Sequence, residues 1–97
     1  MAETDVVVHE PDRSRYVLKR GDQVIGETYY ETGPRGELVF THTEIDEELQ
    51  EKGLGSTLVR GALDEVRTST DARVVAKCPF VFKFIATHPE YQDLTER

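Results

Sequence analysis

The chain has 97 residues, with 12 lysines and arginines against 19 aspartates and glutamates, and a formal net charge of −7 at pH 7. This size predicts one domain, and the acidic charge argues against the clustered basic face that nucleic acids require. We expect a cytoplasmic protein without a membrane partner. The sequence has no apolar run of about 20 residues, its N-terminus does not resemble a secretory signal, and its single cysteine forms neither an internal disulfide nor a zinc site.

The first part of the chain predicts a β-hairpin. We expect residues 1–13 to form a flexible N-terminus and residues 14–97 to form the domain. β-Branched and aromatic residues are frequent in segments 15–20 and 23–30, and Gly21 between these segments supplies the turn.

A third strand is predicted over residues 37–45, after a second glycine-containing turn. Strict alternation places Leu38, Phe40 and His42 on one face of the sheet. The other face then carries Val39, Thr41, Thr43 and Ile45. Three such strands in succession predict an antiparallel meander.

The spacing of the apolar residues then changes to that of a helix. The residues that repeat every four positions are Leu54, Leu58, Ala62 and Val66. A short strand over residues 73–77 follows this helix, which implies a parallel crossover, and Pro79 begins a last helix over residues 79–87. The predicted fold class is therefore a compact α/β domain. Its mixed sheet, an antiparallel meander plus a parallel strand, is flanked by two helices.

Two glycines stand at the start of the first helix. Free backbone N–H groups and the helix dipole favour an anion there, and Gly53 and Gly55 let a phosphate approach the backbone closely. Equally, the glycines could only permit a tight turn between strand and helix. Two other phosphate motifs are excluded: a Walker loop needs its lysine after the glycines, and a Rossmann loop needs a small residue where Leu58 stands.

The run Gln50-Glu51-Lys52-Gly53-Leu54-Gly55 resembles the Q/R-x-x-G-x-G/A pyrophosphate loop of the GNAT superfamily of acetyl-CoA-dependent N-acetyltransferases. The stretches HTEIDEELQEKGLGSTLVRGALDEVR and VVAKCPFVFKFIATHPEY are similar to the small, single-domain branch of that family. The resemblance covers residues 14–94 and implies a GNAT-like fold, acetyl-CoA as cofactor and an amine as acceptor.

The resemblance also implies where coenzyme A binds. The pyrophosphate would lie on Gln50, Lys52, Gly53, Leu54, Gly55 and Ser56, held mainly by backbone N–H groups. The pantetheine arm would run along residues 42–46, including Ile45 and Asp46, and would leave the thioester near Cys78. Because main-chain donors hold the phosphates, no basic surface is needed.

Three side chains are candidates for catalysis. His42 has the chemistry of a general base at neutral pH, and Glu44, two residues later, could relay a proton through water. Cys78 lies at the predicted start of the last helix, where the helix dipole favours a thiolate that could accept the acetyl group before the amine does. Each also has a structural alternative: a hydrogen-bonded histidine, a solvated glutamate and an inert buried thiol.

Members of the family often use a tyrosine of the final helix to protonate the departing thiolate. Phe84 occupies much of that region here, so Tyr91 is a substitute only if the chain end folds back over the site. His88 reads as a capping or packing residue, and His9 as a bystander.

We therefore expect an acetyl-CoA-binding N-acetyltransferase, with no metal and no nucleic-acid partner. The alternative is a non-catalytic module that binds CoA or acyl-CoA. A protein-interaction domain with a vestigial site is a third possibility. The chain lacks the extra elements that wall in the acceptor in typical family members, so we expect an exposed or macromolecular amine, such as a protein amine or a polyamine.

Overall fold

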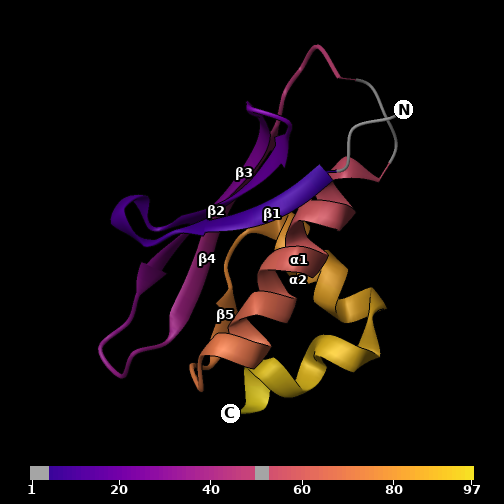
Figure 1. Ribbon diagram of the computed structural model, residues 1–97. Coiled ribbons are helices and arrows are strands. Elements are labelled where there is room, and N and C mark those ends of the chain that lie inside the picture. The colour runs from indigo at the N-terminus through magenta and orange to yellow at the C-terminus, as the bar shows by residue number, and fades with distance from the viewer. Residues whose placement is uncertain (1–4, 50–52) are drawn as a thin grey trace.

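The computed structural model describes residues 5–49 and 53–97 and shows a mixed five-stranded sheet with both α-helices on one face (Figure 1). The strands lie in the order β1-β2-β3-β4-β5, with β1 to β4 antiparallel and β4 parallel to β5. Their bounds are β1 Asp5–Glu10, β2 Arg15–Arg20, β3 Gln23–Thr32, β4 Leu38–Ile45 and β5 Val74–Ala76. The helices are α1 Leu54–Ser69 and α2 Pro79–Thr87, with short 3₁₀ segments at Pro11–Arg13 (η1) and Pro89–Glu96 (η2). The predicted fold class is confirmed.

Residues 1–13 are predicted to form a flexible N-terminus, and strand β1 corrects this prediction over residues 5–10. It pairs with β2 along its whole length, and Asp5 forms an ion pair with Arg20 at 2.8 Å across the two strands. Val7 packs against the core, while Val6 and Val8 point to the opposite, exposed face. The three consecutive valines hide this alternation, because in sequence they form an unbroken apolar run.

The turns between strands form where glycine permits them. Gly21, between β2 and β3, has φ 61°, and Gly36, before β4, has φ 81°. Both values lie in the left-handed region that other residues rarely adopt. The Gly21 prediction is confirmed.

Strand β4 contains a β-bulge that changes which side chains face the helices. Tyr30 pairs with Phe40, but its neighbour Tyr29 pairs with His42, so Thr41 is the extra residue. Before the bulge Phe40 is buried beneath the helices. After it Thr43 takes the inward place and His42 the outward one.

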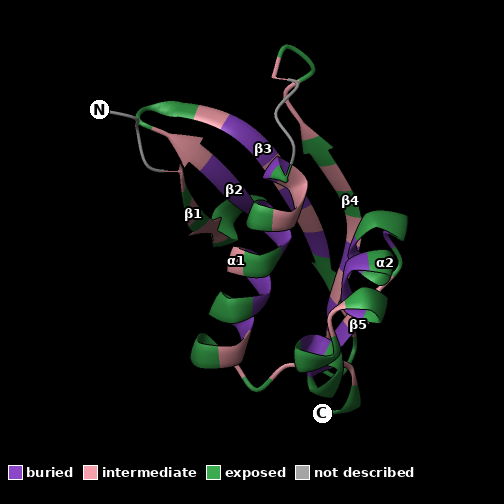
Figure 2. Cartoon of the chain, turned by 90° about the vertical axis from the view of Figure 1, so that its right-hand side faces the viewer, coloured by how far each residue is buried: buried purple, intermediate pink, exposed green. Residues whose placement is uncertain are grey.

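Helix α1 buries the apolar stripe that its sequence predicts. Figure 2 shows this stripe turned toward the sheet, with exposed residues on the other side of the helix. Its buried members are Leu54, Leu58, Val59, Ala62, Leu63 and Val66. A fully buried leucine or valine contributes about 1.5–3 kcal/mol, so this stripe is a large part of what holds the helix on the sheet.

Helix α2 and η2 complete the core beside α1. Val81, Phe84 and Ile85 of α2 and Tyr91 and Leu94 of η2 are buried. No helix in residues 5–49 and 53–97 is long and apolar enough to cross a membrane.

Candidate functional site

Helix α1 begins at a glycine in the left-handed conformation. Gly53 is its N-cap with φ 84° and ψ 0°, and a Cβ placed there would meet no atom within 4 Å. The Gly53 carbonyl accepts the N–H of Thr57 at 2.9 Å, so the N–H groups of Leu54, Gly55 and Ser56 precede the first intrahelical bond. The first turn holds no acidic residue, and within residues 5–49 and 53–97 no side chain caps it. This helix end therefore offers backbone donors and the positive end of the helix dipole to an anion.

Gly55 is a glycine for a different reason. A Cβ at this position would lie 2.6 Å from Cζ of Phe80, the second residue of α2. Gly55 therefore permits the close approach of α2 to α1, a packing role that the sequence did not predict. A cavity of about 240 Å³ borders this contact, and both Ser56 and Lys83 line it. Lys83 adds a cation to this region that sequence reasoning missed, because the residue lies 27 positions after Ser56 on another helix.

Strands β4 and β5 separate next to this helix end. The Phe40 carbonyl accepts from the N–H groups of both Lys77 and Cys78, at 3.0 and 2.8 Å. Ala76, the partner of Phe40, is the last residue of β5, whereas β4 continues to Ile45. The second half of β4 therefore has no parallel neighbour within the described residues.

Cys78 lies where the two strands separate and is the N-cap of α2, as predicted. Its side chain is only 4% exposed, and its Sγ lies 3.4 Å from Oγ1 of Thr43 on the inward face of β4. Thr43 Oγ1 is in turn 2.9 Å from Oγ1 of the buried Thr28. The Cys78 thiol and the hydroxyl groups of Thr43 and Thr28 thus form a row of three polar groups on the helix side of the sheet.

His42 and Glu44 lie on the opposite face of β4 from Cys78. The prediction that His42 shares a face with Leu38 and Phe40 is wrong, because the bulge at Thr41 reverses the alternation. His42 Nε2 is 3.0 Å from Oε1 of Glu44, and both side chains are more than half exposed. The structure therefore brings His42 and Glu44 together but does not bring His42 to the thiol.

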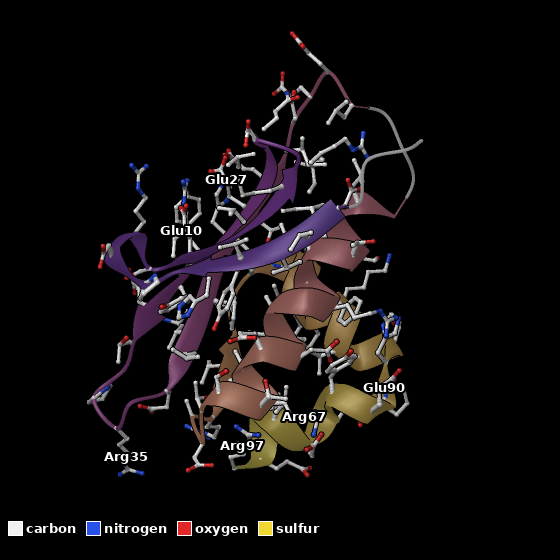
Figure 3. The ribbon with its side chains drawn as sticks, viewed as in Figure 1. Glu10, Glu27, Arg35, Arg67, Glu90 and Arg97 are labelled. Carbon is white, nitrogen blue, oxygen red and sulfur yellow. The ribbon has the colours of Figure 1, made fainter. Side chains whose placement is uncertain are left out.

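The face of the sheet away from the helices carries a network of polar side chains that ends near His42. Figure 3 shows Glu10 and Glu27 on this face. Arg15 contacts Glu10 at 2.6 Å and Glu27 at 3.4 Å, and Tyr29 donates its hydroxyl to Glu27 at 2.5 Å. The hydrogen bond to Glu10, and to a lesser extent the one to Tyr29, raises the pKa of Arg15, so the guanidinium stays positively charged. The Tyr29 ring stacks beside that of His42, with 6.3 Å between centroids.

We name this set the open-face network: Glu10, Arg15, Glu27, Tyr29, His42 and Glu44. Sequence reasoning found only its last two members, because the others meet across three strands whose register no local pattern reveals. Next to it lies a cavity of about 330 Å³, lined by Glu27, Glu44, Ile45 and Asp46 among others. An amine could reach His42 from this side of the sheet.

The remaining candidates have structural roles. Tyr91 is buried and donates its hydroxyl to Asp64 of α1 at 2.7 Å. Burial, followed by the bond to Asp64, raises the pKa of Tyr91. His88 caps α2 and stacks on Phe84 at 3.9 Å. His9 is no bystander, since it stacks on Tyr16 at 4.3 Å and hydrogen-bonds to Tyr30 at 2.7 Å.

Two of the predicted cofactor residues, Gln50 and Lys52, lie outside the described residues. Within residues 5–49 and 53–97, no group of three histidine, cysteine or acidic side chains is arranged to hold a metal ion.

Comparison with protein families identifies the architecture. A family model described as GCN5-related N-acetyl-transferase matches residues 15–94. The chain belongs to this family. No curated protein matched the chain. Proteins of the GCN5-related N-acetyltransferase family generally use acetyl-CoA, and membership supports an acyltransferase type of function.

The residues of this member of the GCN5-related N-acetyltransferase family fit a bound coenzyme A. The first turn of α1 offers uncapped N–H groups without a nearby first-turn carboxylate, and the conformation of Gly53 leaves open space where a side chain would stand. The separation of β4 from β5 leaves one edge of β4 without a parallel neighbour among the described residues, beside the same helix end. Both features come from described residues and suit a phosphate and an extended arm, respectively.

Proposed function

We propose that this chain is an acetyl-CoA-dependent N-acetyltransferase that acetylates an amine approaching from the open face of the sheet. The observation that carries the proposal is the N-terminus of α1, whose first turn holds no acidic residue and which no described side chain caps, beside diverging parallel strands in a chain of this family. The backbone of residues 53–56 would hold the pyrophosphate, with Lys83 beside it. Ile45 and Asp46 would flank the pantetheine, and Gln50 and Lys52 remain predicted contacts.

Acetyl-CoA, when bound, would supply a thioester whose acetyl carbon an amine can attack; the C–S bond then breaks and coenzyme A leaves as a thiolate that takes up a proton from solvent. His42 would take the proton from the attacking nitrogen. Because Nε2 of His42 faces Glu44 at 3.0 Å, Nδ1 is the nitrogen that would accept this proton. Glu44 would fix the ring and stabilise the imidazolium charge, as a carboxylate does for a catalytic histidine.

The direct route fits the geometry better than a route through acetyl-cysteine. The Cys78 thiol is buried and hydrogen-bonded to Thr43, and His42 lies on the other face of the same strand. A covalent route would need the thiol to reach the thioester without the histidine as its base. We therefore assign Cys78 a packing role, and keep acetyl-cysteine as an outcome of the test.

The acceptor we propose is an exposed or macromolecular amine, such as a lysine side chain or a polyamine. His42 and Glu44 are more than half exposed, so the open face does not enclose a small molecule around them. The carboxylates beside the adjoining cavity would attract an ammonium group.

The test compares His42→Gln with Cys78→Ala in acetyl transfer from acetyl-CoA to a lysine peptide and to spermidine. We expect His42→Gln to lower kcat about 10²- to 10⁴-fold and Cys78→Ala to leave it within about threefold. Thermal melting of both variants checks folding, and their affinity for CoA should be unchanged.

Intact mass spectrometry after mixing with acetyl-CoA alone distinguishes the routes. An acetyl adduct on Cys78, together with loss of turnover in Cys78→Ala, would establish the covalent route. CoA binding without turnover on any amine would identify the alternative, a CoA-binding module.

A further inference from the structure

The strand β5 forms an edge of the sheet whose outer side has no strand partner among the described residues. In the part of the chain that the structure describes, β5 pairs with β4 alone, through residues 73, 75 and 77. The Arg73 carbonyl accepts from Leu38, and the Lys77 N–H donates to Phe40. Because backbone groups alternate along a strand, those of Val74 and Ala76 point away from β4. These are the groups to which another strand would bond.

An apolar groove runs along this edge. It has a volume of about 350 Å³ and lies between β5 on one side and α2 and η2 on the other. Its lining residues are Arg73, Val74, Val75, Ala76, Phe82, Ile85, Ala86 and Thr95. Phe82 is 64% exposed, the highest value among the exposed large hydrophobic side chains of the described residues. A strand laid in the groove would therefore cover apolar surface as well as pair its backbone.

The two faces of β5 differ in charge. Val74 pairs with Leu38, and Ala76 pairs with Phe40. Leu38 and Phe40 are buried on the helix face of the sheet, so Val74 and Ala76 lie on that face too. Arg73, Val75 and Lys77 then share the other face by alternation, so exposed cations stand on both sides of a valine. Arg73 also forms an ion pair with Glu37 at 3.6 Å, but 45% of its side chain stays exposed. In a chain of net charge −7, this face of β5 thus carries two exposed cations, one of which shares its charge with Glu37.

These charges select the occupant. A second copy pairing antiparallel about Val75 would place Arg73 against the copy's Lys77 twice, and like charges directly opposite each other are destabilising. A strand with acidic residues at those two positions would instead form two ion pairs across the edge.

We infer that the β5 edge binds an extended peptide segment by strand addition. The segment has acidic residues flanking an apolar residue on one face and apolar residues at the alternate positions that pack on Phe82, Ile85 and Ala86. Backbone pairing supplies affinity and the alternate side chains supply selectivity, as in other cases of strand addition. This role needs neither CoA nor acetyl transfer.

The experiment uses the full chain labelled with ¹⁵N and two capped peptides. One has the central sequence Glu-Ile-Val-Leu-Glu, and the control replaces both glutamates with lysine. We expect the acidic peptide to shift the backbone amides of Val74 and Ala76 and the signals of Phe82. The lysine peptide should bind at least about fivefold more weakly, although the net charge of the protein alone would favour it.

Variants of the protein sharpen the result. Phe82→Glu should weaken binding of the acidic peptide about tenfold by removing the apolar wall. The double variant Arg73→Glu with Lys77→Glu should reverse the preference between the two peptides. Lys83→Glu is the matched control: it changes the charge of α2 next to Phe82 but lies in the cavity with Ser56, so peptide affinity should not change.

Three outcomes would overturn the inference. Shifts confined to Val6 and Val8 of β1 would place the peptide on the other sheet edge, and equal affinity for both peptides would exclude charge selection. Concentration-dependent sedimentation of the chain alone, with shifts at Val74 and Ala76, would show that a second copy occupies the edge. None of these outcomes depends on whether the chain acetylates amines.

Discussion

Replacing Gly61 with alanine tests whether β1 is docked on α1. Gly61 lies in the middle of α1, where a glycine-to-alanine change normally stabilises a helix by about 1 kcal/mol. Here the new Cβ would lie 2.4 Å from Cγ2 and 2.8 Å from Cβ of Val7. Because the Val7 Cβ is attached to the backbone, a change of rotamer cannot relieve the second contact, and β1 must move.

Overpacking of this kind costs about 1–3 kcal/mol, which cancels or exceeds the helix gain. We expect Gly61→Ala to lower the free energy of unfolding by up to about 2 kcal/mol, measured by urea denaturation. In a Val7→Gly background, where the Cβ and both Cγ atoms are gone, the same change should be neutral or stabilising. The two substitutions should therefore show a coupling energy of about 1–3 kcal/mol.

The contrary result is a Gly61→Ala variant that gains the full helix stabilisation in both backgrounds. Additive effects would mean that Val7 does not lie over Gly61, and that the N-terminal residues are not docked as β1. Thermal melting gives a second reading, since 1 kcal/mol shifts the melting temperature of such a domain by about 4–8 °C.

Two further predictions concern ion pairs and hydrogen bonds outside the site. The hydrogen bonds from Arg20 lower the pKa of Asp5 below its ordinary value of 3.8. The pair therefore stabilises the fold above pH 3.8, and this stabilisation is lost as the pH falls through the lower pKa of the folded state. Asp5→Asn should therefore be less stable than wild type at pH 7 and lose less stability between pH 5 and pH 2, as urea unfolding would show; parallel pH profiles would contradict the role of the pair. Tyr91→Phe removes the hydroxyl bound to Asp64 but keeps the buried ring, so we expect a loss of about 1 kcal/mol with α2 and η2 still folded, and an unchanged free energy of unfolding would mean that the bond contributes nothing.

Much of the fold follows from short-range patterns. The four-residue apolar repeat placed α1 correctly, Pro79 began α2, and Gly21 supplied the first turn. The parallel pairing of β4 with β5 followed from the strand–helix–strand order. These features depend on residue patterns within one segment or on the order of the segments, so a single sequence is enough to predict them.

Two features could not be read in this way, and both affect the site. Strand β1 was missed because three adjacent valines show no alternation, and the strand forms only when β2 is present to pair with it. The bulge at Thr41 was missed because it is a property of the pairing between β3 and β4, not of either strand. It moves His42 to the open face, away from Cys78 and beside Tyr29.

The central claim, that coenzyme A binds at the N-terminus of α1, is tested most directly by titrating the ¹⁵N-labelled chain with CoA. We predict the largest amide shifts at Gly53, Leu54, Gly55 and Ser56, with smaller ones along residues 43–46. Gly53→Ala forces a residue with a side chain into the left-handed conformation, which costs about 1–2 kcal/mol, and should weaken CoA binding. Gly55→Ala should still bind CoA, because the exposed Phe80 ring can move aside. Saturable binding of CoA that leaves the amides of residues 53–56 unmoved, or no binding at all, would contradict the claim.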